Sequence, residues 1–140
     1  MLRITIILVG KTKNSELQAL LDDYAKRMTR SLDLRVIVCK TEEQLWDKVD
    51  ASAYLVALEA DGKQLTSPEF AAMLHRLGVQ GQSHIQFIIG PAEGFTGYKK
   101  QPQLRLSLSA MTYSHQTIRL HLFEQLYRAC TVWEGKPFAK

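Results

Sequence analysis

Cysteine is scarce in this sequence, and long hydrophobic runs are missing. Only Cys39 and Cys130 are cysteines among 140 residues, and both lie in apolar periodic segments. Neither a disulfide framework nor a zinc-binding spacing is supported, so we expect reduced, buried thiols and no bound metal. The stretch MLRITIILVGK has an apolar run of only about six residues and no small-residue cleavage site, which argues against a signal peptide or a membrane span. A cytoplasmic protein is therefore expected.

Acidic residues are scarce in the last third of the chain. Residues 98–140 carry 7 basic and 2 acidic side chains, whereas residues 1–97 carry 11 and 12. This excess favours a polyanionic partner, because phosphate neutralisation with counterion release is the main sequence-independent source of nucleic-acid affinity. A solvated basic face explains the same asymmetry, so both interpretations stay open at this point.

Strand and helix patterns alternate along one continuous domain, residues 1–140. The content of 46% hydrophobic and 23% charged residues is that of a globular protein rather than a disordered one. Apolar runs predict strands at 2–9, 34–40, 53–59, 84–89 and 104–109, and amphipathic spacing predicts helices at 15–30, 42–49, 68–77 and 117–133. Ser67 is expected to cap the third helix, before Pro68. This alternation predicts an α/β fold, a mostly parallel sheet with helices on both faces that binds ligands beyond the carboxyl ends of its strands.

The predicted strand at 84–89 runs directly into a loop that contains three glycines. Gly90, Gly94 and Gly97 allow backbone amides to approach a ligand or to adopt a positive φ. Their spacing matches neither the Walker loop nor the dinucleotide fingerprint, and a tight turn needed only for packing explains them equally well. Glu93, in the same loop, either hydrogen-bonds a ribose hydroxyl or faces water.

A second loop, LSLSAMTYSHQT at residues 106–117, is rich in small hydroxyl residues. Ser109, Thr112 and Ser114 can bind neighbouring backbone groups, which would order the loop and let it present its own amides and carbonyls to a purine. His115 lies just before the last predicted helix, whose dipole disfavours the charged imidazole. It is a candidate for substrate contact, with a structural role as the alternative.

The last predicted helix has an unusually wide apolar surface. Its apolar residues span an arc of about 200° at 100° per residue. One face of a sheet rarely hides so much of a helix, so we predict that a second subunit buries part of it. Arg119 projects into the apolar arc, where its guanidinium either reaches to solvent or binds an anion.

Together, FIIGPAEGF and LSLSAMTYSHQTIRLHLFEQLYRA resemble the ribosomal RNA large subunit methyltransferase H family, a minimal group of knotted SPOUT methyltransferases. The resemblance extends from LVGKTK through LVALEADGK to GKPF and covers nearly the whole chain. It implies a C-terminal trefoil knot, which is an exception to the usual rule against knots, and an obligate homodimer with the closing helix in its interface. It also implies methyl transfer from S-adenosylmethionine to N3 of a pseudouridine in 23S ribosomal RNA of assembled ribosomes.

The same resemblance implies which residues form the site. Those expected at S-adenosylmethionine are Leu58, Gly90, Gly94, Leu108, Ser109, Ala110, Met111, Thr112 and Tyr113. Before it attacks the sulfonium methyl, N3 must lose its proton or be held in an electropositive site. Arg119 is expected beside the reacting base for electrostatic stabilisation, and His115 for orientation or proton transfer.

The sequence departs from the family pattern at three places. Pro91 stands where the family has a second glycine and removes one N–H donor. The family ends in a Tyr-His pair followed by a basic residue, whereas this sequence reads KPFAK, in which Phe138 lacks a hydroxyl and Ala139 cannot exchange a proton. The chain is also short around residues 40–52, which we interpret as a trimmed surface connection away from the ligand loops.

Two other functions compete with methyl transfer. One is a knotted, dimeric RNA-binding protein that keeps the cofactor fold but has lost turnover together with the Tyr-His tail. The other is a flavodoxin-like nucleotide-binding domain without a knot, which would bind a flavin or a nucleotide.

Overall fold

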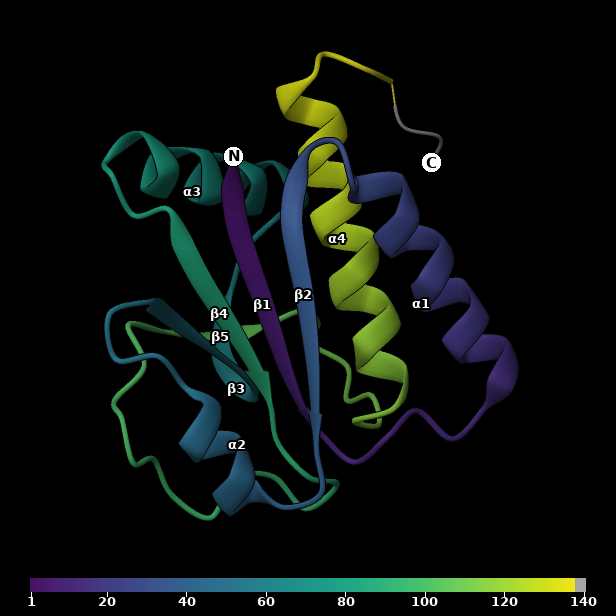
Figure 1. Cartoon of the computed structure of the whole chain (residues 1–140), viewed down its shortest axis with the longest axis vertical. Coiled ribbons are helices and arrows are strands. Elements are labelled where there is room, and N and C mark those ends of the chain that lie inside the picture. Colours follow the sequence, from purple (N-terminus) through teal and green to yellow (C-terminus); the bar gives the residue numbers. More distant parts are fainter. Residues whose placement is uncertain (138–140) are drawn as a thin grey trace.

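Five parallel strands form one sheet in the computed structural model, which describes residues 1–137 (Figure 1). In chain order the elements are β1 (Leu2–Val9), α1 (Ser15–Met28), β2 (Leu32–Cys39), α2 (Glu42–Lys48), β3 (Tyr54–Gln64), α3 (Ser67–Val79), β4 (His84–Ile89), β5 (Leu104–Ser107) and α4 (Thr117–Trp133). Every predicted strand and helix is present. The predicted α/β class is therefore confirmed.

The order of the strands separates this fold from the flavodoxin-like alternative. The sheet runs β2-β1-β4-β3-β5, with all neighbours parallel. A flavodoxin-like sheet places its third strand next to the first, in the order 2-1-3-4-5. Here β4 lies next to β1, and β3 lies between β4 and β5. The flavodoxin-like interpretation is therefore wrong.

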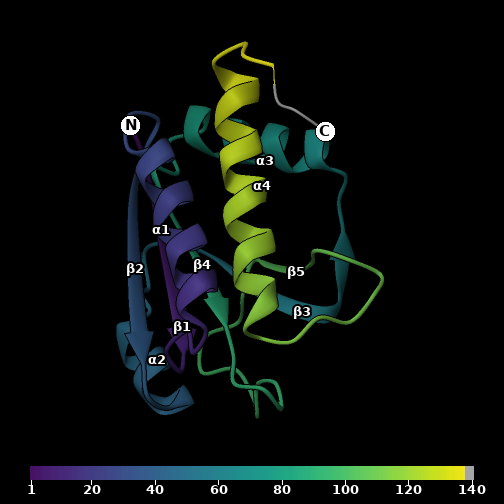
Figure 2. The same ribbon diagram turned by 90° about the vertical axis from the view of Figure 1, so that its right-hand side faces the viewer.

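Side chains alternate between two hydrophobic layers, as the period of a strand requires. On one face Ile4, Ile6 and Leu8 of β1 pack against α1, α3 and α4. On the other, Ile7 and Val9 pack against α2 and the loop that follows β4. Figure 2 shows α1 and α4 side by side over one face of the sheet. Helices on both faces are thus confirmed, in a three-to-one division.

The wide apolar arc of α4 is covered largely within this chain. Leu122, Phe123 and Leu126 are buried, and Leu120 and Tyr127 are partly buried against the same layer. The sheet lies beneath α4, and α1 and α3 flank it (Figures 1 and 2). The sequence argument for a second subunit overlooked this three-sided packing, because helical periodicity does not show which helices become neighbours.

Side-chain caps define the starts of three helices. Asn14 accepts hydrogen bonds from the backbone N–H groups of the first turn of α1, and Thr41 does so for α2. Thr66, not the predicted Ser67, caps α3. Its hydroxyl accepts from the Glu69 N–H, and the Glu69 carboxylate accepts from the Thr66 N–H, which is a capping box. That reciprocal pair satisfies two donors and explains why the helix begins one residue earlier than expected.

β3 extends beyond the predicted end at residue 59. Its pairing with β5 is interrupted between Leu58 and Lys63 and then resumes, so that Leu106 pairs with both. Gly62 lies directly on β5 in this interrupted segment. A Cβ atom there would be 2.7 Å from the carbonyl carbon of Arg105, so only glycine allows the two backbones to approach this closely.

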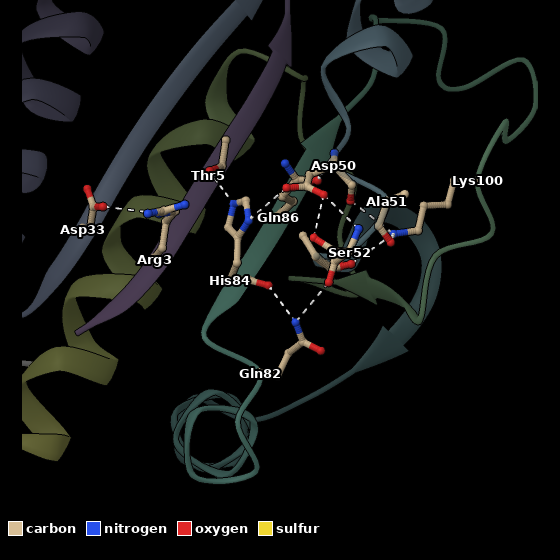
Figure 3. A network of polar contacts seen from close by, with 11 residues as sticks. Arg3, Thr5, Asp33, Asp50, Ala51, Ser52, Gln82, His84, Gln86 and Lys100 are labelled. Atoms are coloured by element: carbon tan, nitrogen blue, oxygen red, sulfur yellow. Dashed lines mark hydrogen bonds and ion pairs between the residues drawn. The ribbon is translucent and has the colours of Figure 1, made fainter.

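A polar network fills the α2 side of the sheet near its amino end (Figure 3). Thr5 Oγ1 lies 3.0 Å from His84 Nε2, and His84 Nδ1 lies 3.7 Å from Asp50 Oδ2. The buried Gln86 accepts a hydrogen bond from the Asp50 N–H, and Lys100 Nζ donates to the carbonyls of residues 50, 51 and 53. The order hydroxyl, imidazole, carboxylate resembles a catalytic triad. Because Thr5 is only 4% exposed, its hydroxyl cannot meet a substrate, and the network is structural.

Candidate functional site

A cavity of about 290 Å³ opens at the carboxyl ends of β4 and β5 and beside the middle of β3. Its walls are the start of the irregular segment of β3, the glycine loop after β4, and the chain from the end of β5 to the first turn of α4. The predicted site residues that line it are Leu58, Gly90, Gly94, Leu108, Ser109, Met111, Thr112, Tyr113 and His115. Ala110 and Arg119 were also predicted and are not among the lining residues. The fold therefore brings the two loops together at one cavity.

The glycine loop turns sharply as it leaves β4. The N–H of Gly94 donates to the Pro91 carbonyl at 2.8 Å, which closes a tight turn, and Gly94 has a φ of +87° that other residues rarely adopt. Pro91 itself lines the cavity. A Cβ added to Gly90 would meet the ring of Phe95 at 3.3 Å. The loop is therefore folded back on its own first residue.

Hydroxyl groups order the second loop, as predicted for Ser109 and Ser114. Ser107 Oγ donates to the Ser109 carbonyl at 2.7 Å, and the Met111 N–H donates to Ser109 Oγ at 2.9 Å. Ser114 Oγ accepts from the Thr117 N–H at the start of α4. Met111, at 74% exposed, and Tyr113, at 41%, stand at the mouth of the cavity. The loop thus combines a fixed backbone with exposed apolar side chains.

His115 lines the cavity, and its surroundings favour the neutral imidazole. Its pKa is lowered from the ordinary value of 6.5, first by burial and then by the charges of Arg119 and Lys13, while Glu93 acts in the opposite direction. The sequence argument named the helix dipole as the cause of this lowering, whereas burial and the two cations account for it here. A neutral imidazole beside a cavity can accept a proton from a bound group.

Arg119 is fully buried and uses its donors on the protein itself. Its guanidinium donates to the Val9 carbonyl at 3.0 Å, to Thr12 Oγ1 at 3.0 Å and to the His115 carbonyl at 3.1 Å. It neither reaches to solvent nor lies on the cavity, which differs from both alternatives left open by the sequence. Gln116 binds the same loop, since its side chain accepts from the Lys13 N–H and donates to the Lys11 carbonyl. The two side chains fasten the start of α4 to the loop after β1.

Most basic side chains in the last third of the chain form ion pairs or hydrogen bonds with other groups of the protein. Arg105 pairs with Glu59 and Asp61, Lys100 binds three carbonyls, and Arg119 is buried. Arg128 and Lys136 have carboxylate partners in Glu124 and Glu134. The excess of positive charge in this segment therefore does not by itself describe a basic surface.

Sequence reasoning missed Glu59 as a lining residue. It follows Leu58 at the irregular part of β3, and Tyr98 and Arg105 both donate to its Oε2 atom. Burial and the Glu59 carboxylate raise the pKa of Tyr98, so the phenol keeps the proton that it donates. The signal was a carboxylate at the last position of a predicted strand, the end at which this class of sheet binds its ligands. Glu93, which the sequence left open, also lines the cavity.

The region around residues 40–52 lies beside a ligand loop, not away from it. Glu42 and Trp46 of α2 contact Thr96 and Phe95, which follow the glycine turn. This segment therefore supports the wall of the cavity.

Comparison with known proteins decides the family. Residues 2–138 match a family model described as predicted SPOUT methyltransferase. The chain belongs to this family. Three similar proteins are each named ribosomal RNA large subunit methyltransferase H. They come from Bifidobacterium adolescentis (36% identical, covering 99% of this chain and 100% of the relative), Shouchella clausii (34%, 99% and 100%) and Protochlamydia amoebophila (34%, 100% and 100%).

Membership of the SPOUT family makes this chain a methyltransferase, as the sequence predicted. It also implies the knotted C-terminal segment of the fold class, and a methyl donor of the S-adenosylmethionine type. Within residues 1–137, no helix combines the length and the apolar character needed to cross a membrane. The same residues do not bring three His, Cys, Asp or Glu side chains together as a metal site would.

The described lining of the cavity suits a cationic ligand better than a phosphate. Its charged members are the carboxylates Glu59 and Glu93, and neither lysine nor arginine is among the lining residues. A sulfonium or ammonium group is attracted by such a lining, whereas the phosphates of a flavin or a nucleotide are repelled. The volume is near the lower end of ligand sites, which measure about 300–1,000 Å³. The residues present therefore fit S-adenosylmethionine.

Proposed function

We propose that this protein transfers a methyl group from S-adenosylmethionine to N3 of a pseudouridine in 23S ribosomal RNA, acting on the assembled ribosome in the cytoplasm. The observation that carries the proposal is that two loops remote in sequence meet at a single cavity whose described charged lining residues are carboxylates. The relatives named above, which this chain matches over essentially their full length, supply the class of substrate.

The cofactor would be held by the backbone of both loops and by the side chains at the mouth. Leu58, in the middle of β3, and Gly90, directly after β4, would contact the ligand, and Gly94 lets the glycine loop turn beside it. Leu108, Ser109, Met111, Thr112 and Tyr113 form the opposite wall, while Ala110 serves only to space that loop. When bound, the cofactor supplies an electrophilic methyl group.

His115 is the side chain that we assign to the acceptor base. It lines the cavity and is neutral, so it can accept the N3 proton or a hydrogen bond from N3–H as the ring nitrogen attacks. Glu93 favours the resulting imidazolium through its negative charge, and Arg119 opposes it. Arg119 is here a positioning residue, because it holds the His115 carbonyl and the start of α4 rather than contacting the cavity.

Lys11 and Lys13 are the cations that we assign to the RNA backbone. Both are exposed in the loop after β1, and this loop is bonded to Gln116 beside His115. Phosphates on either side of the target base would meet these lysines when the base enters the cavity. Binding through two such contacts would weaken as salt rises.

A homodimer is a further part of the proposal. Its structural support is the pair of exposed apolar side chains Met111 and Tyr113 beside the cavity, since α1 and α3 already cover much of α4. Sedimentation equilibrium over a range of protein concentrations tests it. A monomer at micromolar concentration would remove it.

The decisive experiment joins cofactor binding to methyl transfer. Isothermal titration with S-adenosylmethionine is paired with a transfer assay on 70S ribosomes that lack the modification, followed by mass mapping of the large-subunit RNA. Binding together with a methyl group on N3 of one pseudouridine is the expected result. The alternative function, RNA binding without turnover, predicts binding and no transfer. The residues on which that alternative depends, Phe138 and Ala139, lie outside the described part of the chain.

A further inference from the structure

Helix α2 lies against the glycine loop on the face of the sheet opposite the other three helices. Figure 1 shows α2 and the loop after β4 together at the lower left of the molecule. The two segments pack together, because Leu45 and Trp46 of α2 share a hydrophobic layer with Phe95 and Tyr98 of the loop. The loop has no helix or strand of its own between β4 and β5, so its shape depends on what it packs against.

Three aromatic rings join α2 to the wall of the cavity. The ring of Trp46 lies 5.9 Å from that of Phe95 and 6.0 Å from that of Tyr98, and the last two are 5.7 Å apart. Phe95 also lines the cavity and rests against the backbone of Gly90. A displacement of Trp46 would therefore reach the cofactor wall through one intervening side chain.

The carboxylate of Glu42 fixes both partners of this contact. The Thr96 N–H donates to Glu42 Oε1 at 3.0 Å and to Oε2 at 3.2 Å, and the Thr96 hydroxyl donates to Oε2 at 3.2 Å. Trp46 Nε1 donates to the same Oε2 at 3.3 Å. One side chain in the first turn of α2 thus holds the residue after Phe95 and the ring that packs on Phe95.

Two more attachments hold the loop farther along. Tyr98 donates to Glu59, a lining residue from β3, and Lys100 donates to carbonyls in the α2–β3 connection. Between Gly90 and Gly94, by contrast, the recorded backbone bond is the single turn closed on Pro91. Glu42 is therefore the attachment nearest to the part of the loop that has least internal support.

We propose that α2 sets the shape of the cofactor wall and that Glu42 is a positioning residue for the glycine loop. The identity of the ligand in this statement rests on the proposed function. The position of the loop does not, because it follows from contacts within the chain. Glu42 acts by holding Thr96 and Trp46, which keeps Phe95 against Gly90 and leaves the cavity open for its ligand.

The test compares Glu42→Ala with Glu43→Ala. Both glutamates lie in the first turn of α2, so each substitution removes the same favourable charge at a helix N-terminus. Only the first removes the contact with the loop. We expect Glu42→Ala to weaken S-adenosylmethionine binding about ten-fold, the effect of losing a hydrogen bond to a charged acceptor, and Glu43→Ala to weaken it less than about two-fold. Glu42→Gln keeps one acceptor oxygen for the Thr96 N–H and should restore most of the affinity.

Two readouts follow the loop itself. Amide hydrogen exchange of residues 90–98, measured without cofactor, should be faster in Glu42→Ala than in Glu43→Ala, because the Thr96 N–H loses its acceptor. In a Trp133→Phe background Trp46 is the remaining tryptophan. Its emission should then report cofactor binding through Phe95, and Glu42→Ala should diminish that response.

The outcomes separate this inference from the proposed function. If exchange and affinity change equally in the two alanine variants, Glu42 does not position the loop, whatever the protein catalyses. If the unmodified protein binds no S-adenosylmethionine, the proposed function fails, and the exchange rates alone decide the role of Glu42. A loss of thermal stability in Glu42→Ala with unchanged exchange at residues 90–98 would also overturn the inference.

Discussion

The two ends of the sheet are built from the same strands but differ in how they satisfy polar groups. Near the amino end, Thr5, His84 and Gln86 bind one another or residues of the α2–β3 connection, and the network is closed (Figure 3). At the carboxyl end the loops after β4 and β5 meet and enclose a cavity lined by backbone, carboxylates and a histidine whose pKa is lowered.

The difference shows where this fold can keep a ligand site. Side chains that bind each other leave neither space nor free acceptors, so the triad-like order of Thr5, His84 and Asp50 has no chemical consequence. Backbone freed of bulky side chains keeps its donors and acceptors for a guest. Substitutions of residues that line the cavity should therefore change binding, and those at the amino end should change stability alone.

The largest expected effect at the carboxyl end is the loss of S-adenosylmethionine affinity in Gly90→Val. A Cβ at this position already meets the Phe95 ring at 3.3 Å, and two further methyl groups would push Phe95 into the cavity. We expect S-adenosylmethionine affinity to fall by more than about 100-fold, as measured by isothermal titration. Gly97→Val is the matched control, since a Cβ there meets nothing within 4 Å. Unchanged affinity in Gly90→Val would remove Gly90 from the site.

The next largest effect is expected from Arg119→Ala, which should lower both the stability of the protein and its rate of methyl transfer. Removing a buried guanidinium that makes three hydrogen bonds leaves the Val9 carbonyl and the Thr12 hydroxyl without this donor, which should lower the free energy of unfolding by about 3 kcal/mol. Methyl transfer should fall because His115 loses its support. Cofactor affinity should be spared, since Arg119 bonds to His115 and to the loop after β1 and not to the residues assigned to the cofactor.

Urea denaturation, titration and the transfer assay measure the three effects of Arg119→Ala. Arg35→Ala is its control, because the exposed pair with Asp33 contributes at most about 1 kcal/mol. Equal loss of transfer and of cofactor affinity in Arg119→Ala would show that its role is misplaced.

The smallest effect is expected at the amino end, from His84. Burial lowers the pKa of His84 below its ordinary value of 6.5, and the Asp50 charge offsets this only in part. Because the unfolded chain then binds protons more readily, the free energy of unfolding should fall as pH drops below about 6.5. His84→Gln should remove that contribution, lower stability at pH 7.5 by about 1 kcal/mol and leave cofactor affinity unchanged.

Denaturation curves between pH 5 and 8 test the role of His84. The exposed His75 supplies the control His75→Gln, which leaves the network intact. A changed cofactor affinity in His84→Gln would break the distinction between the two ends of the sheet. So would an identical pH dependence in the two variants, since it would place His84 outside any stabilising network.

Local patterns in the sequence predicted the strands and helices, but they did not predict which of these elements pack side by side in the fold. Apolar runs such as residues 2–9 and 84–89 identified buried strands, because a strand covered on both faces needs such a run. The insertion of β4 between β1 and β3 has no local signal. Neither does the flanking of α4 by two helices, which is why its wide apolar arc was attributed to a second subunit.

The candidate site divides in the same way. Gly90, the hydroxyl loop and His115 could be predicted, since their residue types and their resemblance to a family lie within short segments. The contacts of Arg119 with Val9 and Thr12 join residues more than 100 positions apart, and a helical projection shows only that Arg119 faces inward. The support of the glycine loop by α2 depends equally on packing across the sheet.

The walls of the cavity are drawn from three stretches of chain, residues 58–60, 89–95 and 106–118, and Arg119 fastens the last of them to residues 9–12. A growing polypeptide consequently has no complete pocket until its closing helix has left the exit tunnel. The pocket therefore becomes complete only after the segment that supplies its last wall, residues 106–118, has been translated.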